Sequence, residues 1–532
     1  MIRGTRHIRL SRAMRQVISL AMTESAPHLS HAPRPDDAFT VDVTGLDPKG
    51  NGTAQLWARI ANEPKARRFV FTMYRAVPGD RVDVRVVKRR RNQVRAIVER
   101  IVTPSPDRVA PRCAHFGHRD TLGQGCGGCS LQTLSVEAQL RHKREAVLGH
   151  FRHHALDTSV VAPALGLDPP WFYRNKMEFS IGRQRDDRFA VGMHPGGYRY
   201  EVLPLTECHL LSPEASRLVP ALSAWLEATG LAPFEGRTNE GVQRTLTVRE
   251  GKRTGERMLE WTTSHADPFE TVDGPRPAAE VAAAFAEAAM RIGDEVGAPI
   301  TSVWWTRHRA VRGERTRLET HHIAGRPGLR ERLDLVDGHS LSFEIHPRAF
   351  FQPNTGQAEV IYRQVIDASG VQTAPGTLRV LDLYCGTGTI GLCLAPWARE
   401  VVGVELVPDA VENATRNAEA NGIGNARFFA GDAAEVVEAE QMDAPGAFDV
   451  VVVDPPRAGL HEASRALVAR IGAPRVVYVS CNPETLARDL AALTRAGYDI
   501  DHVVPVDQFA HTPHVECVAT LTRRTNPDSS PS

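Results

Sequence analysis

Cys481 and Glu516 are of the residue types that covalent catalysis requires. Cys481 follows RVVYVS, an apolar run typical of a buried strand, and the next residues, Asn482 and Pro483, are a preferred cap and first-turn residue of a helix. We expect a thiol at this helix N-terminus to have a lowered pKa and to act as a nucleophile. Glu516 lies in the polar stretch VDQFAHTPHVECV and is a candidate general base. Taken alone, a cysteine after an apolar strand is also commonly buried and inert.

A glycine-rich turn upstream favours the binding of a nucleotide-like cofactor. Residues 378–396, LRVLDLYCGTGTIGLCLAP, pass from an apolar run into small residues and then into a second apolar run. This pattern predicts a buried parallel strand, a tight turn and a helix whose first N–H groups point into the turn. Gly386 and Gly388 would let the backbone approach a ligand closely. The alternative is that both glycines serve only the strand–helix turn.

Three carboxylates come at the ends of further predicted strands. Glu405 ends the run EVVGVE about twenty residues after the glycines, where an acid can bind the ribose hydroxyls of a cofactor. Asp432 ends ARFFAGD, and Asp454 follows FDVVVV. Because ligands bind at the carboxyl ends of the strands in an open α/β sheet, the three acids are candidates for one site. A single acid in such a place is usually a helix cap.

These residues together predict methylation of a carbon atom. C5 of uracil is a poor nucleophile until a group adds at C6, and addition of Cys481 would give an enolate whose C5 attacks the methyl group of S-adenosylmethionine. Glu516 would then remove the C5 proton, and elimination would free the thiol. The elements that must position them form a Rossmann-like, doubly wound α/β sheet.

The rest of the chain must supply further domains, because 532 residues are enough for two or more cores. The formal net charge of +1 says nothing about an acidic partner, since local patches decide. No apolar run approaches the roughly 18 residues of a membrane helix. Eight cysteines in so long a chain do not indicate a secreted disulfide scaffold, so we expect a reducing, cytoplasmic compartment. The predicted parts are a disordered leader (1–38), a small β-barrel (39–103), a central α+β domain (104–345), the methyltransferase domain (346–525) and a disordered tail (526–532).

The leader contains no convincing element. Arginines recur at every third position from Arg3 to Arg15, with no acid before Glu24, which leaves open a transit peptide or an RNA-binding arm. We favour a disordered leader, or a start at Met22, and assign the stretch no function.

The pattern changes at Phe39 to short β runs separated by turns such as PKGNG and VPGD. Five such runs up to residue 103 predict a barrel of OB-like type, a common platform for single-stranded nucleic acid. The basic run at Lys88, Arg89, Arg90 and Arg91 is suited to neutralising phosphates, although such runs are often solvated turns.

Four cysteines in the N-terminal half form a candidate metal site. Cys126 and Cys129 flank two glycines in CGGC, and Cys113 and Cys208 are the other cysteines of this half. Spacing alone favours zinc, with an iron–sulfur cluster as the alternative. His115 and His118 lie in the same loop, and we expect both to face solvent.

The central region has poor periodicity, apart from a helix expected over Ser135–His150 and a strand-like run, FYRNKMEFSIGR. Its basic residues, such as Arg174 and Lys176, are candidates for RNA contact, and the alternative is a scaffold for the cysteine loop. Gln352 and Asn354 then precede an amphipathic helix and could bind cofactor or substrate. Asn354 could equally cap that helix.

The chain resembles the RNA uracil-C5 methyltransferases, in particular the bacterial type with an iron–sulfur cluster and an N-terminal TRAM domain. The resemblance extends from about Phe39 to Arg524, and its specific carriers are DPPRAGL, YVSCNPET and DQFAHTPHVE. It implies a class I methyltransferase fold, with residues 39–103 as the RNA-binding TRAM domain. It also implies that Cys481 is the nucleophile and Glu516 the base.

The resemblance further assigns cofactors. Residues implied to bind or border S-adenosylmethionine are Gln352, Tyr384, Thr389, Glu405, Asp432 and Asp454. Residues implied to bind a [4Fe-4S] cluster are Cys113, Cys126, Cys129 and Cys208, which favours that cluster over zinc. The family usually places five residues between its first two cluster cysteines, whereas twelve lie between Cys113 and Cys126 here. A longer loop can still close, because loop entropy grows slowly with length. Ala510 stands where the family usually has proline.

We expect the substrate to be RNA, with 23S rRNA favoured over tRNA by analogy, and we expect a monomer without an obligate protein partner or a membrane. Methylation of an exocyclic nitrogen is a rival interpretation of DPP, but Arg457 follows where an aromatic residue would be typical. A non-catalytic RNA-binding protein is disfavoured by the presence of Cys481, Glu516 and the glycine turn.

Overall fold

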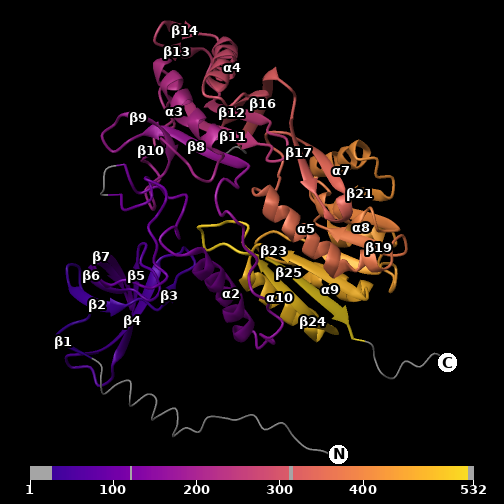
Figure 1. Cartoon of the computed structure of the whole chain (residues 1–532), viewed down its shortest axis with the longest axis horizontal. Coiled ribbons are helices and arrows are strands. Elements are labelled where there is room, and N and C mark those ends of the chain that lie inside the picture. Colours follow the sequence, from indigo (N-terminus) through magenta and orange to yellow (C-terminus); the bar gives the residue numbers. More distant parts are fainter. Residues whose placement is uncertain (1–26, 120–122, 311–315, 525–532) are drawn as a thin grey trace, which may run out of the picture. The chain divides into compact units, whose positions relative to one another are not determined.

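The structure is a computed structural model that describes residues 27–119, 123–310 and 316–524 (Figure 1). The described chain divides into two compact units. The N-terminal unit holds the residues up to Pro111 together with Ser130–Ala138, and the large unit holds Arg112–Cys129 and the chain from Gln139 onward. The predicted tail, 526–532, and residues 1–26 of the predicted leader lie outside the described residues.

The N-terminal unit is a half-barrel of the TRAM-like kind, built on one sheet. Its strands are β1 (His28–Leu29), β2 (Ala38–Asp42), β3 (Gly45–Leu46), β4 (Gly52–Ile60), β5 (Arg67–Met73), β6 (Arg81–Arg90) and β7 (Gln93–Thr103). The order is β1-β4-β5-β7-β6-β2, with β3 paired to β4. This confirms the strands that the sequence predicts from Phe39, whereas β1 lies in a stretch for which no element is predicted.

Alternation along the strands explains the core of this sheet. Val82, Val84 and Val86 of β6 are buried, while the residues between them are more exposed, as a period of two requires. Phe69 and Phe71 of β5 are fully buried in the same core. The basic residues at the end of β6, Arg89 and Arg90, are left exposed.

The central part of the large unit is a second sheet, in the order β10-β9-β8-β11-β12-β15-β16. Its strands are β8 (Lys176–Arg183), β9 (Phe189–Met193), β10 (Leu203–Pro204), β11 (Gln243–Glu250), β12 (Arg257–Ser264), β15 (Ser302–Arg309) and β16 (Arg317–Gly325). Helices α3 (Pro213–Ala228) and α4 (Ala278–Glu295) share one apolar core with it, which includes Leu222, Trp261 and Phe285. Two short hairpins complete this part, β13 (Phe269–Thr271) with β14 (Gly274–Arg276) and β17 (Leu329–Asp334) with β18 (Ser340–Ile345).

The C-terminal part is the predicted Rossmann-like sheet, in the order β21-β20-β19-β22-β23-β25-β24. Its strands are β19 (Arg379–Leu383), β20 (Glu400–Glu405), β21 (Ala426–Ala430), β22 (Val450–Val453), β23 (Arg475–Ser480), β24 (Tyr498–Val506) and β25 (Glu516–Arg523). All neighbours are parallel except that β25 is antiparallel to both β23 and β24. The strand order reverses between β19 and β22, which is where doubly wound sheets bind ligands.

Helices cover both faces of this sheet, so its strands read as near-continuous apolar runs. The helices are α5 (Thr355–Ser369), α6 (Thr389–Leu394), α7 (Pro408–Ala420), α8 (Ala433–Ala439), α9 (Glu462–Ile471) and α10 (Pro483–Arg495), with short 3-10 turns at Val336–Gly338 and Val371–Thr373. One core contains side chains of α5, α6 and α7, and the other contains side chains of α8, α9 and α10. Helix α2 (Val136–His153), close to the predicted Ser135–His150, adds Val147 and Phe151 to the second core. In the described chain, no helix combines the length and apolar character needed to cross a bilayer.

Candidate active site

Cys481 and Glu516 come from neighbouring strands at one edge of the C-terminal sheet. Ser480, the last residue of β23, pairs with Cys517 of β25 in an antiparallel ladder. Continuing that register by one residue places Cys481 opposite Glu516. The two candidate catalytic residues, far apart in sequence, therefore occupy one position of the sheet.

Burial and charge set the protonation of this pair. Burial first, and then the charge of Asp454, raise the pKa of Glu516 to about 8, against the opposing positive charge of Arg457. The pKa of Cys481 is also raised, by burial first and then by the charges of Glu516 and Asp454, again against Arg457. The lowered thiol pKa that the helix N-terminus predicts is thus wrong, because burial and two carboxylates outweigh the helix.

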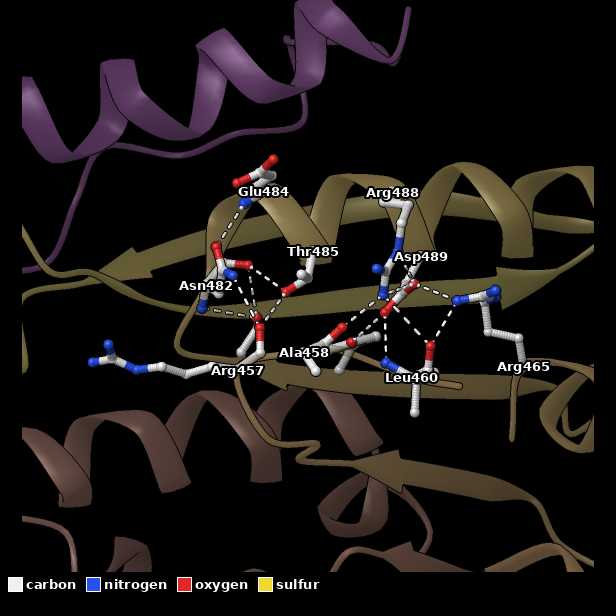
Figure 2. Close-up of polar contacts among 11 residues, drawn as sticks. Arg457, Ala458, Leu460, Arg465, Asn482, Glu484, Thr485, Arg488 and Asp489 are labelled. Atoms are coloured by element: carbon white, nitrogen blue, oxygen red, sulfur yellow. Dashed lines mark hydrogen bonds and ion pairs between the residues drawn. The ribbon is translucent and has the colours of Figure 1, made fainter. Parts of the chain in front are cut away.

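Arg457 belongs to the DPPRAGL loop, residues 454–460. Backbone atoms of this loop accept hydrogen bonds that fix it to helix α10 (Figure 2). The carbonyl oxygen of Arg457 accepts hydrogen bonds from Asn482 Nδ2 at 3.0 Å and from Thr485 Oγ1 at 3.4 Å. Asn482 also caps α10 by accepting from the N–H of Glu484, as predicted. Figure 2 shows the Arg457 side chain extending away from this network. Its charge lowers the pKa values of Glu516, Cys481 and His514, so its guanidinium lies toward the catalytic pair.

Asp489 of α10 is the buried centre of the same network (Figure 2). Its carboxylate accepts hydrogen bonds from the backbone N–H of Leu460 at 2.8 Å, from Arg465 at 2.9 Å and from Tyr478 Oη at 2.8 Å. Gly459 lies against it with a φ of +74°, and a Cβ there would be 2.5 Å from Oδ2 of Asp489. The glycine of DPPRAGL is therefore required both by its backbone and by this carboxylate.

The cofactor turn has the features that a bound nucleotide requires. Tyr384, Gly386 and Gly388 have left-handed φ angles of 64°, 55° and 77° between β19 and α6. The N–H of Gly386 donates to Glu405 Oε2 at 3.1 Å, which holds the acid of β20 against the turn. Asp382 is fully buried, and burial raises its pKa to about 8 while the N–H of Gly391 donates to it.

The predicted cofactor residues gather around this turn to different degrees. Burial first, and then the charges of Asp432, Asp489 and Glu405, raise the pKa of Tyr384. Asp432 also caps α8, as a lone acid at a strand end often does. Thr389 is the first residue of α6, and its hydroxyl lies 3.2 Å from that of Thr387. Asp454 belongs to the catalytic side, where burial raises its pKa to about 7.

Gln352 contacts the segment that leads to Glu516. Its Oε1 accepts a hydrogen bond from Gln508 Nε2 at 3.1 Å, and Asn354 Nδ2 donates to the carbonyl of Gln508 at 3.2 Å. Asn354 also caps α5 by accepting from the N–H of Gln357, so its structural role is present beside any role in binding.

Two residues of α2 that the sequence analysis did not single out hold the same segment from another side. Lys143 donates to Asp507 and, at 3.0 Å, to the carbonyl of Phe509, and its side chain is fully buried. Gln139 Oε1 accepts from the N–H of His511 at 2.9 Å. His511 is buried and stacks on Trp171 at 3.8 Å between ring centroids, and burial lowers its pKa to about 4. The sequence offers no signal for these contacts. Lys143, for example, lies in a basic helical stretch whose pattern predicts an exposed surface.

The four candidate metal cysteines are partly exposed and belong to the large unit. The charge of Cys208 contributes to the raised pKa of Cys113, and Cys129 and Cys208 pack in one cluster with Tyr173. Across residues 27–119, 123–310 and 316–524, however, no three His, Cys, Asp or Glu side chains are arranged to hold a metal ion. As they lie, the cysteines do not form a ligand cage.

The expectation for the histidines of this loop is wrong in one case. His115 is buried rather than solvent-facing, with ring nitrogens 2.9 Å from the carbonyl of Gly123 and 3.0 Å from Thr206 Oγ1. His118 is exposed.

Comparison with known proteins identifies the family of the chain. Residues 312–524 match the family model described as tRNA (Uracil-5-)-methyltransferase. An uncharacterized RNA methyltransferase of Protochlamydia amoebophila is 33% identical over 450 residues, 84% of this chain and 98% of the relative. An uncharacterized RNA methyltransferase of Chlorobaculum tepidum is 34% identical over 462 residues, 84% of this chain and 90% of the relative.

A solved structure matches almost the whole chain. The Pyrococcus abyssi tRNA (uracil-54, C5)-methyltransferase, in complex with S-adenosyl-L-homocysteine, is 27% identical with a TM-score of 0.66. The match covers 91% of this chain and 100% of that one.

Proposed function

The chain belongs to the RNA uracil-C5 methyltransferase family and uses S-adenosylmethionine, and from this premise we propose that it forms 5-methyluridine in 23S rRNA with Cys481 as nucleophile and Glu516 as base. The observation that carries the assignment of the two residues is the register of β23 and β25, which sets Cys481 opposite Glu516. Asp454 and Arg457 complete the group through their effects on both pKa values.

The steps balance with these two side chains. Cys481, as the thiolate, adds to C6 of the uracil, and the π electrons move through C5 to give an enolate with its charge on O4. C5 attacks the sulfonium methyl group, so S-adenosylhomocysteine leaves. Glu516, as the carboxylate, takes the proton from C5, and the electrons of that C–H bond expel the thiolate from C6. Arg457 favours the ionised form of each residue in turn, because its charge lowers both pKa values.

For the cofactor, we assign Gln352, Tyr384, Thr389, Glu405, Asp432 and Asp454 to its binding or its border. S-adenosylmethionine supplies the electrophilic methyl group. What supports the assignment is the turn itself: Gly386 has a left-handed φ of 55°, and a Cβ there would have no atom within 4 Å. A nucleoside can therefore approach this backbone, with Glu405 held beside it by the Gly386 N–H to take ribose hydroxyls.

For the RNA, the N-terminal unit offers a basic hollow. Arg67, Arg90, Arg91, Asn92 and Gln93 line a hollow of about 660 Å³ on the half-barrel. Three cations in one hollow can neutralise phosphates, which is the sequence-independent part of RNA affinity. The second candidate substrate is tRNA, because the Pyrococcus abyssi enzyme of similar fold acts on tRNA uracil-54.

For the cysteines, we propose a [4Fe-4S] cluster at Cys113, Cys126, Cys129 and Cys208. Support comes from the packing of Cys129 and Cys208 in one cluster and from the charge of Cys208, which contributes to the raised pKa of Cys113. Since the described side chains are not arranged as a cage, loading would have to draw them together, and no catalytic step runs through the cluster. Anaerobically purified protein should contain iron and sulfide near four per chain, and Cys208→Ser should lose both. Zinc without visible absorption would contradict the cluster.

The function is tested by S-adenosylmethionine-dependent release of tritium from [5-³H]uridine-labelled RNA, with unmodified 23S rRNA and tRNA transcripts in separate reactions. We expect release from the rRNA with wild type and none with Cys481→Ala. Release from tRNA alone would replace the proposed substrate, and methyl transfer without tritium release would overturn C5 chemistry.

A further inference from the structure

Two exposed tyrosines stand in the connection between β9 and β10, in the sequence HPGGYRYE. Tyr198 and Tyr200 are 48% and 46% exposed, among the most exposed large apolar side chains in the described chain. They line a groove of about 720 Å³ together with Arg119, Gln184, Arg185, His194, Arg199 and Glu201. The groove lies wholly within the large unit, and the steps assigned above do not use it.

Planar cations lie against both rings. The Arg119 guanidinium is 3.7 Å from the centroid of Tyr198, and it also donates to Glu201. Arg199 and Arg237 approach the ring of Tyr200 at 4.7 and 4.5 Å. Guanidinium groups at these distances make cation–π contacts and present flat surfaces of their own.

The loop that carries the tyrosines is fastened at its base. His194 reaches across it, with Nδ1 2.8 Å from the carbonyl of Glu201 and Nε2 3.0 Å from Ser180 Oγ of β8. Pro195 is buried and pairs with Cys126 through an isolated antiparallel β-bridge of the backbone. The loop that carries the exposed rings is therefore fixed at its base. Because it is already ordered, little conformational entropy is lost when a ligand stacks on the rings.

The cysteine loop supplies part of that support. The N–H of Gly127 donates to the carbonyl of His194 at 3.0 Å, and the N–H of Gly196 donates to the carbonyl of Gly125 at 3.1 Å. A Cβ on Gly127 would be 2.8 Å from the carbonyl oxygen of His194, so the first glycine of CGGC allows this close approach. These hydrogen bonds connect the backbone of the cysteine loop to the backbone of the loop that carries the tyrosines.

We propose that this groove, which we call the tyrosine groove, binds a single-stranded segment of the RNA substrate through stacking of bases on Tyr198 and Tyr200. Arg119, Arg185 and Arg199 outnumber the one acid of the lining, Glu201, so the groove has a positive balance that suits the phosphates of the same strand. Exposed aromatic rings interleaved with arginines are the means by which proteins bind single strands without reading base edges. The assignment rests on the proposed function, because it deepens the account of the same substrate.

The test measures RNA affinity and methyl transfer with the full-length enzyme. The variants are Tyr198→Ala/Tyr200→Ala and the conservative Tyr198→Phe/Tyr200→Phe, which keeps the rings and removes the hydroxyls. Val272→Ala, at an exposed apolar residue outside the groove, is the matched surface control. The RNA is the transcript, rRNA or tRNA, from which wild type releases tritium.

We expect the double alanine variant to raise Kd and KM about tenfold or more, since stacking contributes about 1 to 3 kcal/mol per base. Its kcat at saturating RNA should stay near wild type, because the groove positions the strand and does not touch the reacting atoms. The phenylalanine variant and Val272→Ala should bind like wild type. Photocrosslinking to RNA that contains 4-thiouridine should label the peptide with Tyr198 and Tyr200.

Three results would overturn the groove while leaving the methyltransferase activity intact. These are an unchanged Kd in the double alanine variant, a loss of affinity in the phenylalanine variant equal to that in the alanine variant, or crosslinks that include neither residue 119 nor residues 184–201. Failure of the function itself is distinct, because wild type would then release no tritium from either transcript. If the alanine variant lost both kcat and thermal stability, the two rings would have a role in folding. That result would also contradict RNA binding in the tyrosine groove.

Discussion

Cys481 and Glu516 occupy opposing positions one residue beyond the last paired position of two antiparallel strands, where Ser480 meets Cys517. All the other strands of this sheet run in one direction, so the reversal of β25 is what brings a residue from the start of a strand to an edge otherwise formed by strand ends. The proposed nucleophile and the proposed base, remote in sequence, become neighbours through this single antiparallel strand. The geometry makes their two roles separable by experiment.

Replacement of Glu516 by glutamine should stop the reaction after methyl transfer. The amide cannot take the C5 proton, so the methylated uracil would remain bonded to Cys481 through C6. We expect a covalent protein–RNA adduct that survives denaturing electrophoresis and carries a labelled methyl group. Cys481→Ala and the double variant Cys481→Ala/Glu516→Gln are the controls, and both should give no adduct. An adduct in either control would remove Cys481 from the nucleophilic role.

The activity should rise with pH and depend on Arg457. Both catalytic groups have raised pKa values, about 8 for Glu516, and both must lose a proton to act, so kcat/KM should increase as pH rises from 6 to about 9. Arg457 lowers both pKa values by its charge, and Arg457→Gln should therefore move the rise to higher pH, while Arg457→Lys stays closer to wild type. Tritium release across this pH range measures the shift. A profile that falls with pH, or one that Arg457→Gln does not move, would contradict this arrangement.

Much of this site follows from sequence patterns because its residues sit at element boundaries. The glycine turn at Gly386 and Gly388, the strand-end acids and the Asn482 cap are all set by local rules of strands and helix ends. The protonation of Cys481 was not predictable in this way. Its local helix favours the thiolate, but burial first, and then the charges of Glu516 and Asp454, raise the pKa, and all of these depend on the assembled sheet.

Removal of one partner from the buried pair of Lys143 and Asp507 should lower the free energy of unfolding by several kcal/mol. Both side chains are fully or almost fully buried, and Lys143 also holds the carbonyl of Phe509. Lys143→Met leaves the Asp507 carboxylate without this partner in an apolar site, so we expect a loss of about 3 to 5 kcal/mol in the free energy of unfolding. Lys143→Met/Asp507→Leu should recover much of it, because no buried charge then remains.

Urea unfolding followed by circular dichroism measures both variants. The exposed pair of Arg291 and Glu295 on α4 is the control, and Arg291→Ala should change the free energy of unfolding by at most about 1 kcal/mol. If the double variant is as unstable as Lys143→Met alone, an uncompensated charge is not the cause of the loss.

Residues such as Lys143 mark the limit of sequence reasoning in this chain. A lysine within LRHKREAVLG has the pattern of a solvated helix face, and only the packing of α2 against the segment that leads to Glu516 makes it an interior residue. His115 was misassigned for the same reason, because the partner that buries it, Thr206, is remote in sequence. The central sheet escaped detailed prediction because its strands pair across long insertions, as β12 does with β15.

Replacement of Gly459 by alanine should impair catalysis through the network around Asp489. The residue has a φ of +74°, and the new Cβ would lie 2.5 Å from the Asp489 carboxylate that orders Leu460 and Arg465. That loop also carries Arg457, whose carbonyl is held by Asn482 beside the nucleophile. Displacement of Asp489 would therefore move the cation relative to Cys481, and we expect kcat to fall at least tenfold with a smaller change in the KM for S-adenosylmethionine.

Gly446→Ala is the matched control for this substitution. Gly446 has a similar φ of +80°, and a Cβ there would have no atom within 4 Å, so the variant introduces the same backbone strain of about 1 kcal/mol without a clash. Similar losses of stability in both variants, with loss of kcat in Gly459→Ala alone, would place the effect in the Asp489 network. If both variants changed kcat equally, backbone strain alone would explain the effect of Gly459→Ala. Displacement of Asp489 would then have no effect on the positions of Cys481 and Glu516.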